Sequence, residues 1–207
     1  MTTLTAREGY RIWAANYNAA PNPIVSLLDR NLDLGDIRGK RVMDVACGTG
    51  RSIERTGGIG SDLSFEMLAR CTRPSVQADA RQLPFPDGIA DVVLCTLALG
   101  YIDPPRAAME EMRRIAKPGG LVIVADLHPK AIAAGWKRSF RDADSVYEIA
   151  NQPYSLGDLA IDGLSLEDSR DLYFGEPERA IFEQAGKTDR WEQACAIPAL
   201  WMRRWRK

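Results

Sequence analysis

The amino-acid sequence predicts an α/β fold with a doubly wound, mostly parallel seven-stranded sheet and helices on both of its faces. Short apolar segments alternate with segments of helical spacing from residue 40 to residue 127, which is the pattern of consecutive β-α-β units. Residues 91–97 are almost entirely apolar, as expected of a strand covered on both faces inside a parallel sheet. Glycine or proline separates most of these segments, so their approximate boundaries follow from the sequence.

Two helices are predicted before the first strand. Tyr10, Trp13 and Tyr17 recur at helical spacing and give the first helix an aromatic face. Asn22 can cap the second helix and Pro23 suits its first turn. The full set of expected helices covers residues 5–18, 24–30, 51–56, 65–69, 104–117, 155–161 and 177–184.

The strands are predicted from apolar runs and from the residues that follow them. We expect the seven strands of the sheet at residues 41–46, 59–62, 76–79, 91–97, 121–126, 164–173 and 197–206. A small hairpin around Asp142-Ala143-Asp144 is expected between the fifth and sixth of them. No internal repeat or linker interrupts the pattern, which therefore indicates one domain.

Composition excludes several classes of protein. The 207 residues contain 27 Lys and Arg against 28 Asp and Glu, so the chain lacks the basic excess typical of nucleic-acid-binding proteins. Four cysteines without a CxxC pair and a single histidine exclude the common zinc patterns and a disulfide framework. No apolar run approaches the roughly 20 residues of a membrane span. We therefore predict a cytoplasmic protein with no metal, nucleic-acid partner or membrane partner; the sequence leaves its oligomeric state undetermined.

Acidic residues lie within or at the end of three of the predicted strands, at one edge of the sheet. A glycine turn at residues 47–50 ends the first strand, but Ile53 stands where a dinucleotide-binding fingerprint needs its third glycine. Asp44, Asp62 and Asp79 are expected to face the same edge, above the switch point of the sheet. Carboxylates suit the hydroxyl, amino and ammonium donors of S-adenosylmethionine (SAM) better than a pyrophosphate. The alternative is that each aspartate only caps a turn.

Four segments carry a resemblance to a known family. Residues 42–51 (VMDVACGTGR) resemble motif I of class I SAM-dependent methyltransferases, and residues 62–68 resemble the second-strand motif whose acid holds the ribose. Residues 79–87 are similar to the segment that contacts adenine, and residues 113–120 resemble the turn before the fifth strand. The four occur in the family's order, closest to the ubiquinone/menaquinone-type branch that acts on small molecules.

The resemblance implies a Rossmann-like fold and a particular set of cofactor contacts. An N-terminal lid at residues 1–35 would cover a SAM-binding core at 36–128, and residues 129–207 would supply a substrate-cap insertion and the C-terminal strands. Tyr17 would touch the carboxylate of SAM from the lid. The residues expected to bind SAM, or its product S-adenosylhomocysteine (SAH), are Tyr17, Asp44, Ala46, Cys47, Gly48, Gly50, Asp62, Leu63, Asp79, Ala80, Cys95 and Thr96.

Two departures from the family pattern concern this same region. Ala46 stands where glycine is most common, which narrows the space for the methionine part of SAM. Asp44 and Asp62 are 18 positions apart, which is short for the family, so the helix between the first two strands should be short.

The acceptor side is less clearly marked. Residues 96–101 (TLALGY) do not match the Asn/Asp-Pro-Pro-Tyr/Phe segment of nucleic-acid amine methyltransferases. His128 follows the fifth strand and is predicted to be the general base, although a structural hydrogen bond to a loop is the alternative. Tyr101, His128, Trp136 and Arg138 are expected to bind substrate: Trp136 could wall an aromatic pocket and Arg138 could meet an anion, while a purely structural hairpin would also explain both residues.

These expectations together predict an enzyme that transfers the methyl group of SAM to an O, N or C nucleophile of a small molecule. Methyl transfer needs alignment and exclusion of water more than it needs acid–base groups, because the sulfonium is an excellent leaving group. The alternatives are a protein that binds SAM or a nucleotide without transferase activity, and an NAD-type oxidoreductase.

Overall fold

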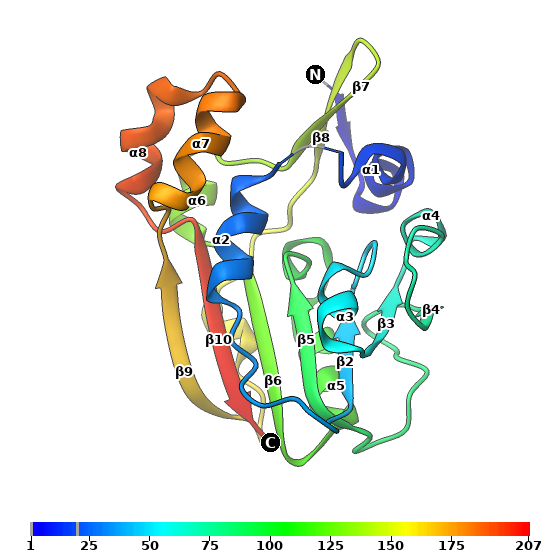
Figure 1. The fold of residues 1–207 in the computed structure, drawn as a ribbon. Coiled ribbons are helices and arrows are strands. Elements are labelled where there is room, and N and C mark those ends of the chain that lie inside the picture. The colour runs from blue at the N-terminus through cyan, green and yellow to red at the C-terminus, as the bar shows by residue number, and fades with distance from the viewer. Residues whose placement is uncertain (1, 20) are drawn as a thin grey trace.

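The predicted seven-stranded sheet is confirmed by the computed structural model, which describes residues 2–19 and 21–207 (Figure 1). The strand order is β4-β3-β2-β5-β6-β10-β9, with β10 antiparallel to both of its neighbours. Five of the strands, β2 to β6, form a parallel array. The strands are β2 (Val42–Val45), β3 (Ile59–Asp62), β4 (Ser75–Gln77), β5 (Ala90–Thr96), β6 (Ala116–Leu127), β9 (Ser165–Leu172) and β10 (Leu200–Arg206).

The strand order reverses between β2 and β5. From β2 the chain runs outward through β3 to β4 on one side, and then returns to β5 and β6 on the other side. The loops after β2 and β5 therefore diverge and leave space between them at the carboxyl ends of the strands, where ligands bind in doubly wound sheets.

Most helices agree with the sequence prediction. The α-helices are α1 (Ala6–Trp13), α2 (Pro23–Asn31), α3 (Arg51–Thr56), α4 (Phe65–Leu68), α5 (Pro105–Ile115), α6 (Pro129–Ala133), α7 (Glu176–Gln184) and α8 (Trp191–Cys195). The 3-10 helices are η1 (Ala14–Asn16), η2 (Leu99–Tyr101), η3 (Leu156–Leu159) and η4 (Thr188–Arg190). The helix α3 has only six residues, as the short spacing between Asp44 and Asp62 predicts.

Some boundaries and elements differ from the prediction. The helix α5 starts after Pro104 and has no side-chain cap, so Asp103 does not cap it. Residues 155–161 contain a 3-10 helix instead of an α-helix. The sequence pattern did not reveal α6, α8 or the short strand β1 (Thr2–Leu4). Elements of three to five residues are too short to carry a periodic signal.

Alternate residues of β5 point into two hydrophobic cores. Val92 and Leu94 pack in a cluster with α2, α7 and α8, whereas Val93 and Cys95 pack in a cluster with α5. All four side chains are almost completely buried. Helices therefore cover both faces of the sheet, as predicted for a parallel sheet (Figure 1).

The predicted lid at residues 1–35 divides into two parts. Only its first part, α1 and η1, lies near the carboxyl ends of the parallel strands. The second part, α2, packs on a face of the sheet beside α7, with Leu27 and Leu28 completely buried. The apolar side chains of α2 thus belong to the core, and the prediction that residues 24–30 form part of a lid is wrong.

A second, three-stranded sheet lies beyond the carboxyl ends of the parallel strands. It contains β1, β7 (Ser139–Asp142) and β8 (Ser145–Ile149) in the order β1-β8-β7, and so confirms the predicted hairpin. The helix α1 packs against this sheet: the ring of Trp13 stacks on Phe140 with centroids 4.9 Å apart. Residues from both halves of the chain thereby form one unit above the main sheet (Figure 1).

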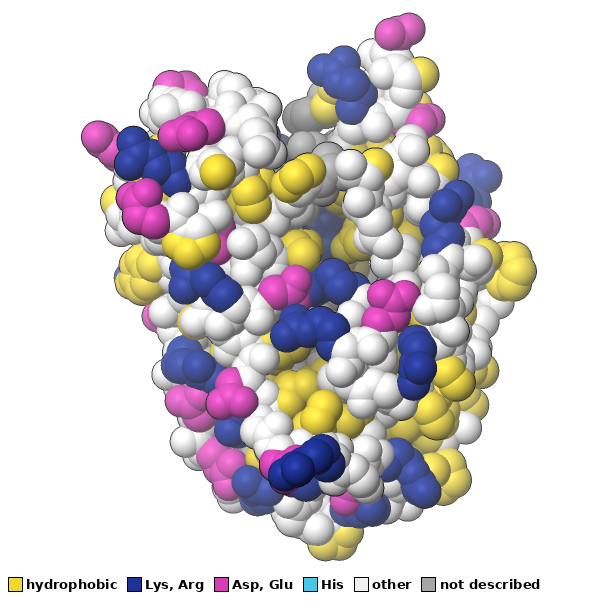
Figure 2. All heavy atoms as spheres, viewed as in Figure 1, with side chains coloured by type: hydrophobic (Ala, Val, Ile, Leu, Met, Phe, Trp, Pro, Cys, Tyr) yellow, Lys and Arg dark blue, Asp and Glu magenta, His cyan; other side chains and the backbone are white. Residues whose placement is uncertain are grey.

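The surface is mixed in charge. On the face shown in Figure 2, Lys and Arg side chains are interspersed with Asp and Glu, and no large area of one sign is seen. Within the described part of the chain, none of the helices is both long and apolar enough to cross a membrane.

An ion pair between the exposed side chain of Arg30 and the buried carboxylate of Glu178 joins α2 to α7. The carboxylate of Glu178, fully buried, accepts bonds from both Nε and Nη2 of Arg30 at 3.0 Å and from the hydroxyl of Ser26 at 3.0 Å. It also accepts a bond from the backbone N–H of Gly175. Four donors converge on this one carboxylate, so its removal leaves several polar groups without a partner.

We expect Glu178→Ala to lower the free energy of unfolding by about 1–3 kcal/mol, because it leaves the hydroxyl of Ser26 and the backbone N–H of Gly175 without their acceptor. Glu183→Ala on the same helix is the matched control: Glu183 is exposed and pairs only with Arg179, so its loss should cost less than about 0.5 kcal/mol. Urea unfolding of both variants measures the difference, and equal losses would show that the bonds to Glu178 contribute no more than a surface pair.

Candidate functional site

A cavity of about 310 Å³ opens at the carboxyl ends of the parallel strands, under α1 and the β7–β8 sheet. Its walls come from the loops after four strands and from the unit above them. The lining residues used below are Arg7, Tyr10, Tyr17, Ala46, Cys47, Gly48, Arg51, Asp62, Leu63, Asp79, Ala80, Arg81, Thr96, Tyr101, Asp103 and Arg138. The cavity thus lies at the switch point between β2 and β5.

Most of the residues predicted to bind the cofactor lie together here. Nine of the twelve line the cavity, and the remaining three, Asp44, Gly50 and Cys95, lie behind its wall. Arg7, Tyr10, Arg51 and Arg81 also line the cavity but were not predicted as site residues, although Arg51 and Arg81 lie within the motif segments 42–51 and 79–87. Tyr10 was noted only as part of an aromatic helix face.

The turn after β2 brings backbone close to the cavity. Gly48 and Gly50 have φ angles of +57° and +84°, which favour glycine. A Cβ atom on Gly50 would also lie 2.3 Å from Sγ of Cys71, so no larger residue fits there without movement. Ala46 has a φ of +58°, and this left-handed conformation explains physically why glycine would be favoured at its position.

Asp62 joins the ends of β2 and β3. One carboxylate oxygen accepts a bond from the backbone N–H of Gly48 at 2.8 Å, and the other accepts one from the backbone N–H of Ser64 at 2.8 Å. Burial raises the pKa of Asp62, while these backbone donors oppose the rise. Each carboxylate oxygen can accept a further bond, so Asp62 can also receive hydroxyl groups of a ligand.

Asp44 is a buried acid with an unused acceptor. Its exposed fraction is 2%, and its Oδ1 atom has no hydrogen-bond partner among residues 2–19 and 21–207. Burial raises the pKa of Asp44 to about 7; the carboxylate of Asp62 adds to this, and Arg51 opposes it. A buried polar atom without a partner is costly, so a ligand that supplies positive charge or a donor nearby would stabilise the ionised form.

Asp79 is held by a neighbouring arginine. The two oxygens of its carboxylate accept bonds from Arg81, the shortest of them 2.6 Å, and this pairing lowers the pKa of Asp79. Arg81 also donates to the backbone carbonyl of Asp103 at 2.6 Å. A ligand that donates to Asp79 must therefore share its carboxylate with Arg81.

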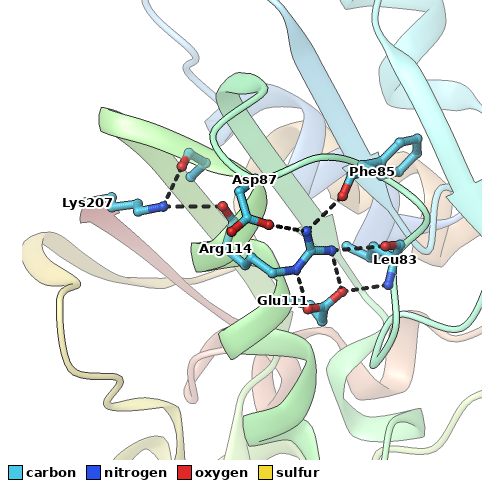
Figure 3. A network of polar contacts seen from close by, with 7 residues as sticks. Leu83, Phe85, Asp87, Glu111, Arg114 and Lys207 are labelled. Atoms are coloured by element: carbon cyan, nitrogen blue, oxygen red, sulfur yellow. Dashed lines mark hydrogen bonds and ion pairs between the residues drawn. The ribbon is translucent and has the colours of Figure 1, made fainter.

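The loop after β4 is fixed from below by Arg114 on α5, as Figure 3 shows. The guanidinium of Arg114 donates to the carbonyls of Leu83 and Phe85 at 3.0 and 2.8 Å and to the carboxylate of Asp87 at 2.7 Å. Glu111 pairs with Arg114 and accepts a bond from the backbone N–H of Leu83. This network holds the segment that includes residues 79–87 in one conformation beside the cavity.

His128 and Trp136 are not among the cavity-lining residues. Nδ1 of His128 accepts a bond from the backbone N–H of Lys130 at 3.0 Å and caps α6, and its Nε2 lies 3.4 Å from a carboxylate oxygen of Asp171 on β9. Trp136 stacks on Phe174 in the core beside α7, with centroids 5.4 Å apart. This geometry does not support the predicted roles of His128 as general base and of Trp136 as a pocket wall.

Tyr101 and Arg138 do line the cavity, as predicted. Nη1 of Arg138 donates to the hydroxyl of Tyr10 at 2.8 Å, and its guanidinium carbon lies 5.5 Å from the ring centroid of Tyr101. Tyr10 is on α1, Tyr101 is in η2 and Arg138 precedes β7. Three distant segments therefore meet at this end of the cavity.

Comparisons with known proteins agree with this geometry. The family described as "Methyltransferase domain" matches residues 43–124, which run from β2 into β6. A demethylmenaquinone methyltransferase of Renibacterium salmoninarum is 37% identical over 107 residues, covering 46% of this chain and 45% of the relative. A fatty-acid O-methyltransferase of Mycolicibacterium smegmatis is 31% identical over 122 residues, covering 52% and 44%. This chain therefore matches less than half the length of these two relatives.

One solved structure is similar to this chain over most of the length of both proteins. The S-adenosylmethionine-dependent methyltransferase of Mesorhizobium loti superposes with a TM-score of 0.64 at 18% identity, covering 88% of this chain and 96% of that one. At this identity the likeness shows the fold, which is the Rossmann-like arrangement predicted from the sequence motifs.

The raised pKa of Asp44 has a measurable consequence for stability. A free aspartate has a pKa of about 3.9, so between pH 4 and 7 the folded protein binds this proton more tightly than the unfolded chain. The stabilisation is therefore complete below about pH 4 and is lost as pH rises through about 7. Asp44→Asn removes the titration, so the ligand-free variant should be more stable than wild type at pH 8 by up to about 4 kcal/mol.

Urea unfolding of ligand-free protein between pH 5 and pH 8 tests this expectation. Asp144→Asn, at the exposed tip of the hairpin, makes the same change of charge without burial and should keep the wild-type pH profile. If Asp44→Asn and wild type showed parallel profiles, the carboxyl of Asp44 would not titrate in this range.

Proposed function

We propose that this chain, whose residues 43–124 form a class I SAM-dependent methyltransferase domain, transfers the methyl group of SAM to a small-molecule acceptor. The observation that carries the proposal is the cavity at the switch point, where the turn after β2 and Asp62 after β3 are joined by a hydrogen bond. The matched family covers these two elements and the loops after β4 and β5.

The residues around the cavity fit the parts of SAM. Asp62 would hold the ribose hydroxyls, since its carboxylate oxygens can still accept bonds after binding the backbone. The unpartnered oxygen of Asp44 indicates an unmet demand for positive charge beside the turn after β2, which the ammonium and sulfonium of SAM would supply. The loop of Asp79 and Ala80 would contact adenine, and Tyr17 would contact the methionine part.

When bound, SAM supplies an electrophilic methyl carbon and a neutral thioether as leaving group. The chain's own contribution is to position the two reactants and to keep water out. The network of Arg114 fixes residues 83–87 of the loop whose earlier residues, 79–81, line the cavity. Tyr10 of α1 and Tyr17, which follows η1, also line the cavity. We propose that α1 with η1 is the lid, since these elements supply the cavity's roof.

The acceptor is proposed only as a class. The curated relatives named above act, by their names, on different molecules, and this chain covers less than half of each. A small molecule is favoured because the surface in view carries no basic area for nucleic acid. We also propose a cytoplasmic location, which is supported by four cysteines that are all free thiols.

Binding of the cofactor provides the first test. In calorimetry we expect micromolar dissociation constants for SAM and SAH and much weaker binding of NAD (on the order of 1 μM–1 mM is usual for enzyme ligands). Asp62→Asn should weaken SAH binding about 10–100-fold, because it replaces charge-assisted bonds by neutral ones. Asp144→Asn serves as the control. Tight NAD binding without heat from SAM would overturn the proposal.

Turnover provides the second test. Methyl transfer from SAM with a labelled methyl group should be detected with at least one member of a panel of phenols, amines and carboxylic acids. Binding of SAM without transfer to any acceptor would instead support a SAM-binding protein that is not a transferase.

The position of His128 predicts how its variants behave. His128→Ala should leave methyl transfer within about 3-fold of wild type and lower the free energy of unfolding by ~1 kcal/mol, because it removes a helix cap. His128→Asn should restore that stability, since asparagine caps well. A general base would instead show a loss of about 10²–10⁴-fold in turnover in both variants, and that result would return His128 to the site.

A further inference from the structure

Arg138 places a positive charge in the cavity without a carboxylate to balance it. The side chain is half-buried and lines the cavity, and its one side-chain hydrogen bond within the described residues goes to the hydroxyl of Tyr10. No salt bridge of Arg138 occurs among residues 2–19 and 21–207. A guanidinium has five N–H donors, so most of its donor capacity is unused.

The other three arginines of the cavity wall are either paired with a carboxylate or exposed to solvent. Arg51 pairs with Asp29, and Arg81 pairs with Asp79 at 2.6 Å. Arg7 is exposed on α1, where water can solvate its charge. Arg138 alone among these four is both half-buried and without a salt bridge within the described structure.

The surroundings of Arg138 are poor in compensating charge. The rings of Tyr10 and Tyr101 enclose its guanidinium, and Tyr17 lies 6.2 Å from Tyr10 between ring centroids. The nearest acid that influences it, Asp126, is itself buried and already accepts bonds from the backbone N–H groups of Gly100 and Leu127. The unpaired N–H groups of Arg138 are accessible from the cavity, so an anion bound there can pair with them.

Arg138 lies toward a different side of the cavity from Asp62 and Asp79, which fit the ribose and adenine of SAM. Its guanidinium carbon lies 5.5 Å from the ring centroid of Tyr101 in η2, which follows β5, and the neighbouring Gly100 donates to Asp126 on β6. Asp62 ends β3 and Asp79 follows β4, on the other side of β2 in the strand order. An acceptor bound on the β5 side of the cavity would therefore meet Arg138.

We propose that Arg138, held by Tyr10, binds a carboxylate of the methyl acceptor, so that the acceptors of this enzyme are small alkyl or aryl carboxylic acids. The inference rests on the proposed methyl transfer and names its substrate class. A planar carboxylate matches the paired donors of a guanidinium, and the tyrosine rings provide an apolar wall for the rest of such a molecule. SAM also carries a carboxylate, so the test must separate the two sources.

The probes are cinnamate and decanoate, each with its neutral amide as the matched compound. Their dissociation constants are measured by equilibrium dialysis, with and without saturating SAH. Wild type should bind at least one acid about 10-fold or more tightly than its amide, because an ionic pair inside the cavity replaces a neutral hydrogen bond. Arg138→Gln should abolish this preference, and Arg138→Lys should keep part of it.

Arg141→Gln is the control, since Arg141 is an exposed arginine on β7, the strand that Arg138 precedes, and it should behave as wild type. Thermal unfolding of each variant shows whether the hairpin remains folded. Tyr10→Phe leaves the charge of Arg138 in place but removes its hydrogen-bond partner. This variant should weaken binding of the acid less than Arg138→Gln does.

Two results would overturn the inference. The first is a wild type that binds neither acid better than its amide, or an Arg138→Gln variant that keeps the preference. The second is a loss of about 10-fold or more in SAH affinity in Arg138→Gln, with affinity for 5′-methylthioadenosine unchanged. That compound lacks the amino-acid carboxylate, so Arg138 would then bind the cofactor. A wild type without SAH binding is a separate result, which would remove the proposed function itself.

Discussion

The bond between Asp62 and the backbone N–H of Gly48 is the interaction on which the candidate site depends. Parallel strands end with backbone donors that no neighbouring strand satisfies, and their loops diverge from that point. One carboxylate after β3 fixes the turn after β2 and, through Ser64, the start of α4. The same carboxylate keeps acceptor capacity toward the cavity. The side chain of Asp62 thus both fixes the turn after β2 and offers acceptors to a ligand. These two roles explain why an acid is needed at this strand end.

The roof of the cavity depends on pairing between segments that are far apart in sequence. The strand β1 pairs in parallel with β8, where Leu4 lies opposite Ile149, and Gly9 of α1 approaches Ile149 so closely that a Cβ atom there would lie 2.7 Å from its side chain. The helix α1 is therefore attached to the hairpin more extensively than to the main sheet. Motion of one of them must involve the other, so closure over a ligand would move α1 and the hairpin together.

The sequence was informative where local chemistry decides the structure. The strand at residues 59–62 and the cap by Ser64 follow from neighbouring residues alone, and both are confirmed. The sequence did not predict the direction of a side chain where packing against distant segments decides it. Strand alternation would place the side chain of residue 128 on the same side of the sheet as that of Asp126. The chain instead turns at His128 into α6, so the ring caps that helix and meets Asp171 of β9. A short helix of five residues gives no periodic signal of its own.

Some charged residues in and around the cavity form ion pairs and others do not. The paired residues hold loops in place, whereas the unpaired ones are available to bind a ligand. Arg114 with Glu111, and Arg81 with Asp79, are ion pairs whose donors and acceptors hold loops in place. Asp44 and Arg138 instead have unused capacity in poorly solvated surroundings, one an acceptor and the other several donors. Such groups lower the stability of the ligand-free protein, because burial is not offset by a partner. Ligands that carry the complementary charges relieve this cost on binding. The two groups have opposite sign: Asp44 lies behind the cavity wall beside the turn after β2, and Arg138 lines the cavity beside η2. This arrangement matches the proposed cationic methyl donor on one side and anionic acceptor on the other.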